Sequence, residues 1–261
     1  ARTAEEASAR VVEICERVGA KRVTKGKSMV SEEMNLNAAL EKSGIEAVET
    51  DLGEYIVQLA SERPSHIIAP AVHKTRDQIT ELFHHHHKPL GYIDRVTERK
   101  AIVNEARSIL RERFVTADVG ITGANFLVAE TGSSVIVTNE GNGDLTSSLP
   151  RVQIVTAGIE KLIPSLEDLS TMLRVLARSA TGQEMSAYTS LYSGPRKEGH
   201  NEGPTEYHVI LLDNGRSGML GGEYQSMLRC IRCGACLNHC PCLLYTSDAA
   251  DDTPCVDLGG R

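Results

Sequence analysis

The stretch from residue 31 to residue 69, SEEMNLNAALEKSGIEAVETDLGEYIVQLASERPSHIIA, decides the fold class. Ser31, followed by two glutamates, has the composition of a helix start, and Gly44 comes just after the last apolar position of that helix. Apolar residues 45–48 then predict a strand, residues 54–60 a helix and residues 66–69 another strand. This alternation predicts a parallel sheet covered by helices, which is an α/β fold.

The same reading extends to both sides of this stretch. The elements predicted outside it are helices at 3–18, 75–83, 95–113 and 165–178, and strands at 22–23, 119–121, 126–129, 134–137, 152–156 and 207–212. Segment 181–205 is rich in Gly, Ser, Thr and Pro, which predicts a long loop. From residue 214 the chain is loop-like and leads into a group of cysteines.

Length and composition limit the possible functions. The chain has 261 residues, 41% of them hydrophobic and 24% charged, which suits one large α/β domain or a domain with a small module. A net charge of −7 argues against nucleic-acid binding and leaves no basic face for anionic lipid. The apolar runs are too short for a transmembrane segment, and no signal peptide is recognisable, so we expect a cytoplasmic protein. The chain begins with Ala1 instead of Met, so we expect it to start inside a longer protein.

The cysteines are unevenly distributed. Cys15 stands alone on the apolar face of the first predicted helix, where we expect it to be buried by packing. The other six lie close together near the end of the sequence, whereas a disulfide-stapled protein spreads its cysteines through the fold. The clustering therefore indicates a metal site in a reducing compartment.

Residues 230–241, CIRCGACLNHCP, carry the strongest chemical signal. They match the bacterial ferredoxin pattern C-x2-C-x2-C-x3-C-P, in which the first three thiolates bind one 4Fe-4S cluster and the fourth binds a neighbouring cluster. The predicted ligands are thus Cys230, Cys233 and Cys236 for the first cluster and Cys240 for the second. A structural zinc site, which usually shows two separated C-x2-C pairs, is the alternative.

Two clusters need a second cysteine run, which this sequence does not show. The segment where it would begin, including CLLYTSDAADD, resembles translated sequencing-adapter read-through. A genuine disordered acidic tail is the alternative. We therefore expect an N-terminally truncated α/β domain at 1–213, the first half of a two-cluster module at 214–241, and a foreign or disordered tail at 242–261.

Three phrases carry a family resemblance. Residues 25–83, residues 121–145 (ITGANFLVAETGSSVIVTNEGNGDL) and the cysteine run after MLRC are similar to the lactate utilization protein B family, in order and across most of residues 21–241. The resemblance implies an α/β domain of the CoA-transferase and sugar-phosphate-isomerase type, followed by a ferredoxin-like module with two 4Fe-4S clusters. It also implies an electron-transfer subunit of a complex that oxidises L-lactate to pyruvate. The implied partners are a cysteine-rich protein and a second protein with the same α/β domain.

Two other classes of function stay open. One is a ligand-binding or acyl-transfer enzyme that uses Glu130, because the CoA-transferase-like relatives have a nucleophilic glutamate at a strand end, with the cysteine module as a redox sensor. Glu130 as a turn cap is the alternative. The other is a scaffold whose iron–sulfur module only docks partners. Polar residues at the expected strand ends, namely Asn139, Glu140, Asn142 and Asp144, suggest a pocket there.

Several weaker motifs also need an interpretation. Lys25 to Ser28, KGKS, has no glycine at position 21 and so is no phosphate loop; it predicts either an anion site at a helix start or a solvated basic loop. Residues 141–146 are interpreted as a turn. The histidines at 84–87 are interpreted as a solvated helix end, since adjacent helical residues point in different directions. His66 is expected to satisfy hydrogen bonds in the core.

Overall fold

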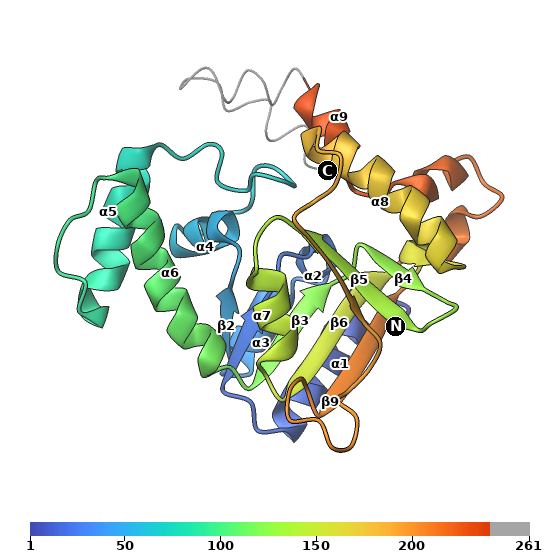
Figure 1. Ribbon diagram of the computed structural model, residues 1–261, viewed down its shortest axis with the longest axis horizontal. Coiled ribbons are helices and arrows are strands. Elements are labelled where there is room, and N and C mark those ends of the chain that lie inside the picture. The colour runs from blue at the N-terminus through green and yellow to red at the C-terminus, as the bar shows by residue number, and fades with distance from the viewer. Residues whose placement is uncertain (241–261) are drawn as a thin grey trace.

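A five-stranded parallel sheet forms the centre of the molecule. The computed structural model describes residues 1–240, so the tail expected at 242–261 lies outside the described residues. The sheet has the order β2-β1-β3-β6-β9, and each pair of neighbours runs parallel. Its strands are β1 (Arg22–Lys25), β2 (Glu46–Glu49), β3 (Val119–Gly123), β6 (Val152–Gly158) and β9 (Glu206–Leu212). The α/β prediction with a parallel, helix-covered sheet is confirmed (Figure 1).

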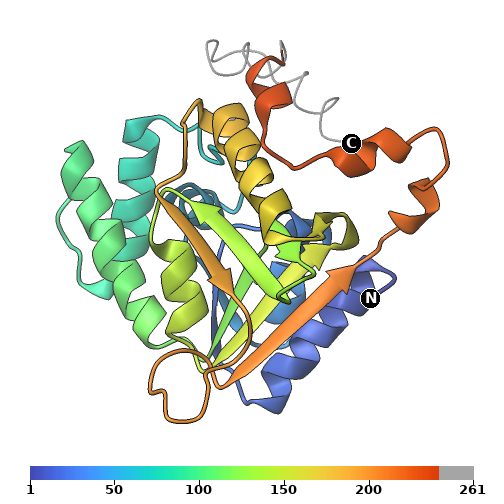
Figure 2. The same ribbon diagram turned by 45° about the vertical axis from the view of Figure 1, so that its right-hand side comes forward.

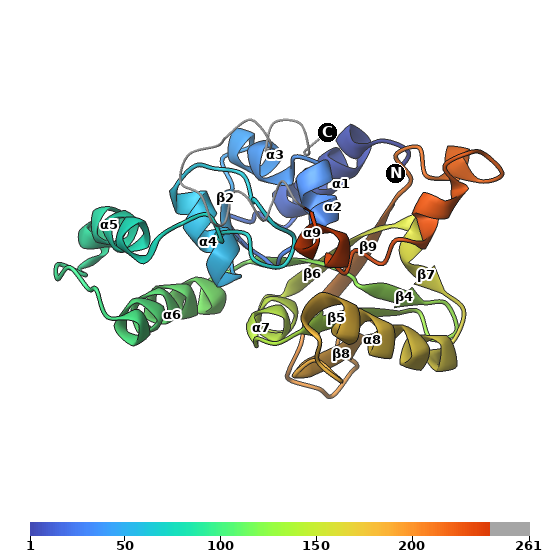
Figure 3. The same ribbon diagram turned by 90° about the horizontal axis from the view of Figure 1, so that it is seen from above.

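Helices cover both faces of this sheet. Figure 3 shows α1 (Ala4–Arg17), α2 (Met29–Glu33) and α3 (Leu36–Lys42) on one side and α7 (Asn142–Ser148) on the other. The core under the first group joins Val11 and Cys15 of α1 to Ile121 and Ile154 of the central strands, all fully buried. Strand β6 is buried along its whole length, as expected for a strand of a parallel sheet that is covered on both faces.

A helical layer extends the fold beyond β2. It contains α4 (Leu52–Leu59), α5 (Arg76–His87) and α6 (Arg99–Val115). A second apolar core lies here, with Tyr55 of α4, Phe83 of α5 and Phe114 of α6 among its members. Thr75 begins α5 with a capping box to Gln78, so the helix predicted at 75–83 is confirmed in type and is longer than expected.

A second, smaller sheet packs against the first (Figure 2). It has the order β7-β4-β5-β8, antiparallel except for the parallel pair β4 and β7. Its strands are β4 (Phe126–Val128), β5 (Ser133–Thr138), β7 (Leu162–Ile163) and β8 (Tyr188–Tyr192). Helix α8 (Leu166–Thr181), capped by Ser165, covers it and completes a third core with Phe126 and Val135.

Short helical turns connect or follow these elements. They are the 3-10 turns η1 (Lys88–Leu90), η2 (Ile159–Lys161), η3 (Ser217–Met219) and η4 (Gln225–Arg229), and the one-turn helix α9 (Ala235–Asn238). After β9 the chain leaves the sheet and returns to α8, where α9 lies (Figures 1 and 2). Within residues 1–240, no helix combines the length and apolar character needed to cross a membrane.

Two predictions around the opening stretch are wrong. The helix expected from Ser31 begins instead after Ser28, whose Oγ accepts a hydrogen bond from the Ser31 backbone, and it is split in two at Asn35, which has a left-handed backbone with φ of 50°. The strand expected at 66–69 is absent, because His66 Nδ1 accepts hydrogen bonds from the backbone of Ile68 and Ala69 and closes a turn. His66 thus satisfies buried hydrogen bonds, as expected.

Two further segments are more regular than predicted. The turn expected at 141–146 is helix α7, which fits tightly over β3: a Cβ at Gly120 would lie 1.8 Å from the Thr146 carbonyl oxygen. The loop expected at 181–205 contains β8, an edge strand whose residues are partly exposed. Its sequence, YTSLY, is short and lacks the regular apolar alternation that marks a strand.

Candidate functional site

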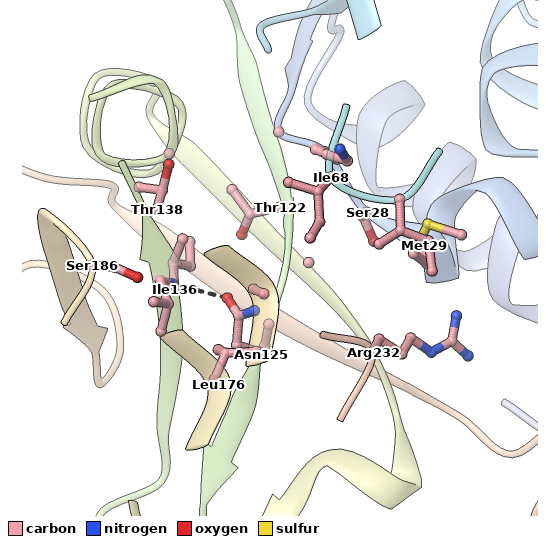
Figure 4. A pocket seen from close by; sticks show the side chains of 18 of the residues that line it. Ser28, Met29, Ile68, Thr122, Asn125, Ile136, Thr138, Leu176, Ser186 and Arg232 are labelled. Carbon is pink, nitrogen blue, oxygen red and sulfur yellow. Dashed lines mark hydrogen bonds between the residues drawn. The ribbon is translucent and has the colours of Figure 1, made fainter. Parts of the chain in front are cut away.

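A cavity of about 360 Å³ lies where strands β1, β3 and β6 end. Its lining comes from the loop after β1, the ends of β3 and β5, and helix α8, as Figure 4 shows for Ser28, Thr122, Ile136 and Leu176. Ligands of open α/β sheets bind outside the carboxyl ends of the strands, so the position is a usual one for a binding site. Residues 231–233 of the cysteine run form a further part of the wall.

Buried hydroxyl groups line one side of the cavity. The Thr156 hydroxyl lies 3.1 Å from the Ser31 hydroxyl and 3.4 Å from the Ser28 hydroxyl, and all three residues are buried. A Cβ at Gly123 would lie 2.9 Å from Ser28 Oγ, so a larger residue there would displace the Ser28 side chain. The strand ends therefore present hydrogen-bonding groups that the fold holds in place.

Lys27 and Lys161 line the cavity, and the side chain of neither makes a hydrogen bond or ion pair with a described residue. Burial lowers the pKa of Lys27, although the surrounding carboxylates, Asp51 first, oppose the shift. Burial, reinforced by the positive charge of Arg232, lowers the pKa of Lys161 to about 8. Lys25 differs, because it is buried and pairs with Glu49 at 2.8 Å. The solvated-loop interpretation of the KGKS segment is therefore wrong for Lys25, which is buried. Lys27 and Ser28 of the same segment line the cavity.

The cysteine run docks against the α/β domain at two apolar positions. Ile231 and Cys233 pack on the core that includes Leu176. Gly234 has a left-handed backbone with φ of 77°, and a Cβ there would lie 3.0 Å from Ile68 Cδ1, so this turn is closed against the loop before α5. The turn precedes α9, which contains Cys236.

The donor chemistry of the run suits an iron–sulfur cluster, since thiolates at this spacing are its usual ligands. Cys230 and Cys236 are exposed, and Cys233 and Cys240 are half-buried. Across residues 1–240, no three His, Cys, Asp or Glu side chains are grouped closely enough to hold a metal ion. The four cysteines therefore remain predicted ligands, identified by type and spacing.

An ionic cluster ties the segment after β9 to the rest of the fold. Arg216 donates to both carboxylate oxygens of Glu33, at 2.9 and 2.7 Å, and its Nε lies 2.6 Å from Glu160. Arg232, inside the cysteine run, lies 3.5 Å from Glu33 and 3.7 Å from Glu160. Burial opposes ionisation of Glu33, yet the hydrogen bonds from Arg216 and Asn214 hold its pKa below the ordinary value. Figure 4 shows the Arg232 guanidinium directed away from the cavity.

The predicted polar pocket is gathered only in part. Asn139, Glu140 and Asn142 line the cavity, whereas Asp144 accepts hydrogen bonds from Ser190 and Tyr192 of β8. Glu130 is exposed and does not line the cavity; its carboxylate accepts a hydrogen bond from the Leu166 backbone at the start of α8. This contact matches the turn-cap alternative for Glu130.

The structure confirms the prediction for Cys15 and contradicts part of the prediction for the four histidines. Cys15 is fully buried in the first core, as expected, and burial raises the pKa of its thiol to about 12. The histidines do end a helix, but the solvated interpretation is wrong for His87. Its ring is fully buried and lies 2.9 Å from the Tyr55 hydroxyl and 2.7 Å from Glu105.

Sequence reasoning missed Lys161 and the partners of Arg216. Lys161 follows the apolar strand β6 in a segment, GIEKLIP, that gives no sign of a buried cation. Glu33 and Glu160 lie far apart in the sequence and only the fold brings both to Arg216. A charged residue directly after a buried parallel strand was the one usable signal, because such positions lie at the ligand-binding edge of the sheet.

Comparison with known proteins identifies the class. The LUD domain family model matches residues 1–212, so the chain belongs to the LUD domain family. Among curated relatives, lactate utilization protein B of Bacillus subtilis (strain 168) is 49% identical over 242 residues, and that of Anoxybacillus flavithermus is 48% identical over 242 residues. Each alignment covers 92% of this chain and 50% of the relative, so the chain spans about half the length of these proteins. The resemblance to lactate utilization protein B is confirmed.

One solved structure was also matched. The DUF162 family protein from Deinococcus radiodurans shares 10% sequence identity with this chain at a TM-score of 0.32, with 81% of this chain and 99% of that chain covered. A similarity at this level supports no conclusion about this chain.

Proposed function

We propose that this chain is part of an iron–sulfur electron-transfer subunit that takes part in the oxidation of L-lactate to pyruvate. The observation that carries the proposal is the C-x2-C-x2-C-x3-C-P run within a chain whose relatives are named lactate utilization protein B. The proposed ligands are Cys230, Cys233 and Cys236 for one 4Fe-4S cluster and Cys240 for a second. In a longer chain, a second cysteine run would supply the remaining thiolates of a ferredoxin-like module. A bound cluster would supply one-electron transfer.

The docking of the run supports this role. Ile231 and Cys233 pack on the apolar core of the second sheet, which removes this part of the loop from water. Arg232 of the run lies close to Glu33 and Glu160, the carboxylates that also bind Arg216 in the segment after β9. Hydrophobic burial and nearby charge are the means by which proteins protect clusters and tune their potentials. The α/β domain, of the CoA-transferase and sugar-phosphate-isomerase type in this proposal, then acts as the rigid support of the electron-transfer module.

The proposed partners follow from the division of labour. This chain contributes no recognised flavin or nicotinamide motif, so we assign the oxidation of lactate itself to another subunit. We propose a cysteine-rich protein and a second LUD domain protein as the other members of the complex. The proposed location is the cytoplasm, where thiol ligands stay reduced.

Anaerobic reconstitution with iron and sulfide tests the metal assignment. The chain, extended by the second cysteine run, should bind iron and acid-labile sulfide in equal amounts, and Cys233→Ser should lose most of both. Cys15→Ala is the matched control, since Cys15 is buried in a different core, and it should retain the iron and sulfide of the parent. Zinc bound without sulfide would refute the iron–sulfur assignment.

A further inference from the structure

Lys161 is a buried cation that the electron-transfer role does not use. Its exposed fraction is 6%, it lines the cavity at the strand ends, and it makes no hydrogen bond or ion pair with a described residue. An isolated buried ammonium is costly, so proteins normally pair it or use it at a functional site. The η2 turn, which follows β6 directly, fixes the backbone of this lysine at the carboxyl edge of the sheet.

The described groups of opposite charge nearest Lys161, Glu160 and Cys230, favour its charged form, but neither makes a hydrogen bond or ion pair with it. Glu160, the adjacent carboxylate, already contacts Arg216 at 2.6 Å. Around it, the guanidiniums of Arg216 and Arg232 and the carboxylates of Glu33 and Glu160 balance each other, two against two. Lys27, the other cavity lysine, faces the carboxylates of Asp51 and Glu140 instead. Lys161 is therefore the buried ammonium that this balance leaves at the cavity wall.

The other residues that line the cavity limit the charge and the polarity of any ligand that could bind there. Asp51 and Glu140 also line it and outnumber Lys27, the one cation beside them among the described lining residues, so a second negative charge would meet carboxylates of like sign. Apolar side chains, among them Ile136 and Leu176, line another part and suit a hydrocarbon group (Figure 4). A volume of about 360 Å³ equals about a dozen water molecules at ~30 Å³ each, which is ample for a small organic acid.

We propose that this cavity binds a small organic monocarboxylate, with the Lys161 ammonium as the partner of its carboxylate. The hydroxyls of Ser28 and Thr156 lie at the same strand ends and are available to a polar group of the ligand. The site goes beyond the electron-transfer role and does not depend on it, since binding requires no cluster. Because Ile231, Arg232 and Cys233 form part of the wall, the ligand lies next to the cysteine run.

Thermal-shift and calorimetric titrations of the purified chain test the proposal. The probes are L-lactate, pyruvate and their longer-chain monocarboxylate homologues, with succinate and inorganic phosphate as comparison anions. At least one monocarboxylate should bind saturably and raise the melting temperature, as a ligand specific for the folded state does. Lys161→Met should weaken that binding by roughly tenfold to a hundredfold, the range expected for loss of a charge-assisted hydrogen bond. Lys42→Met, an exposed lysine outside the cavity, should bind like the parent.

A second readout separates binding from a structural role. Because the Lys161 ammonium makes no hydrogen bond or ion pair within residues 1–240, Lys161→Met should melt at the same temperature as the parent or higher. Ala180→Leu, on the α8 wall, should weaken binding by filling space while Lys161 stays intact, and it serves if Lys161→Met does not fold. The proposal is overturned if no monocarboxylate binds, if succinate or phosphate binds as tightly, or if both cavity variants bind like the parent.

Discussion

Replacement of Arg216 by Met should destabilise the protein far more than the same replacement at Arg17. Arg216 is 6% exposed and bonds to two carboxylates, and removal of one partner from a buried ion pair costs about 3–5 kcal/mol. Arg232 lies 3.5–3.7 Å from the same carboxylates and offsets part of this loss, so we expect about 3 kcal/mol. The Arg17–Glu206 pair is exposed, and ion pairs at the surface contribute little to stability.

Equilibrium urea unfolding, followed by circular dichroism, measures the difference. Methionine retains most of the apolar stem of arginine, so both substitutions chiefly remove the guanidinium. The two variants should have the same dependence on urea concentration as the parent, with midpoints that differ. Hydrogen exchange at residues 214–219 should rise in Arg216→Met only, because Arg216 holds this segment to Glu33 and Glu160. Equal losses of unfolding free energy in the two variants would refute the assignment of Arg216 as a buried anchor.

Three further predictions concern the fold and its titration. His87→Ala should lower the unfolding free energy by about 3–5 kcal/mol, because it empties a fully buried aromatic position and leaves Glu105 and Tyr55 without this hydrogen-bond partner. His85→Ala, at an exposed position in the same run, should change the unfolding free energy by less than about 0.5 kcal/mol. Thermal melting decides, and equal effects would contradict the buried network. Gly120→Ala should cost at least about 1–3 kcal/mol, since its Cβ would lie 1.8 Å from a backbone oxygen of α7, and urea unfolding that matches the parent would show that α7 moves freely. Burial, with the charges of Glu49 and Glu32, raises the pKa of Glu54 from 4.5 to about 8, so the folded protein holds this proton more tightly than the unfolded chain. The stability that this group contributes is therefore lost between about pH 4.5 and pH 8, and Glu54→Gln should gain a few kcal/mol relative to the parent across that window. A pH-independent difference between the two proteins would contradict the buried carboxyl.

The fold class was predictable because parallel strands and amphipathic helices leave periodic apolar patterns. Residues 45–48 and 152–156 are such runs, and the structure has β2 and β6 there. The local errors arose where a side chain competes with the backbone pattern. The residues after Pro64 look like a strand, but the His66 ring takes the hydrogen bonds that a ladder would need.

The sequence indicated only those candidate residues that lie close to one another along the chain. Cys230, Cys233, Cys236 and Cys240 could be proposed as ligands because iron–sulfur ligation imposes a fixed spacing on residues that are close in the sequence. Lys161 and the Arg216 contacts were not recognisable, because they depend on segments that only the topology brings together. His87 shows the same limit, since its burial depends on Tyr55 and Glu105 in other helices.

Electron transfer to the reconstituted protein tests the central claim most directly. The sample is the chain extended by the second cysteine run and loaded with iron and sulfide, together with the two proposed partner proteins. L-lactate is added anaerobically, and the visible absorbance of the cluster is followed. The cluster absorbance should bleach only when lactate and both partners are present, and the bleaching should be lost in Cys233→Ser. An intact cluster that stays oxidised under these conditions, while the partners still convert lactate to pyruvate, would contradict it.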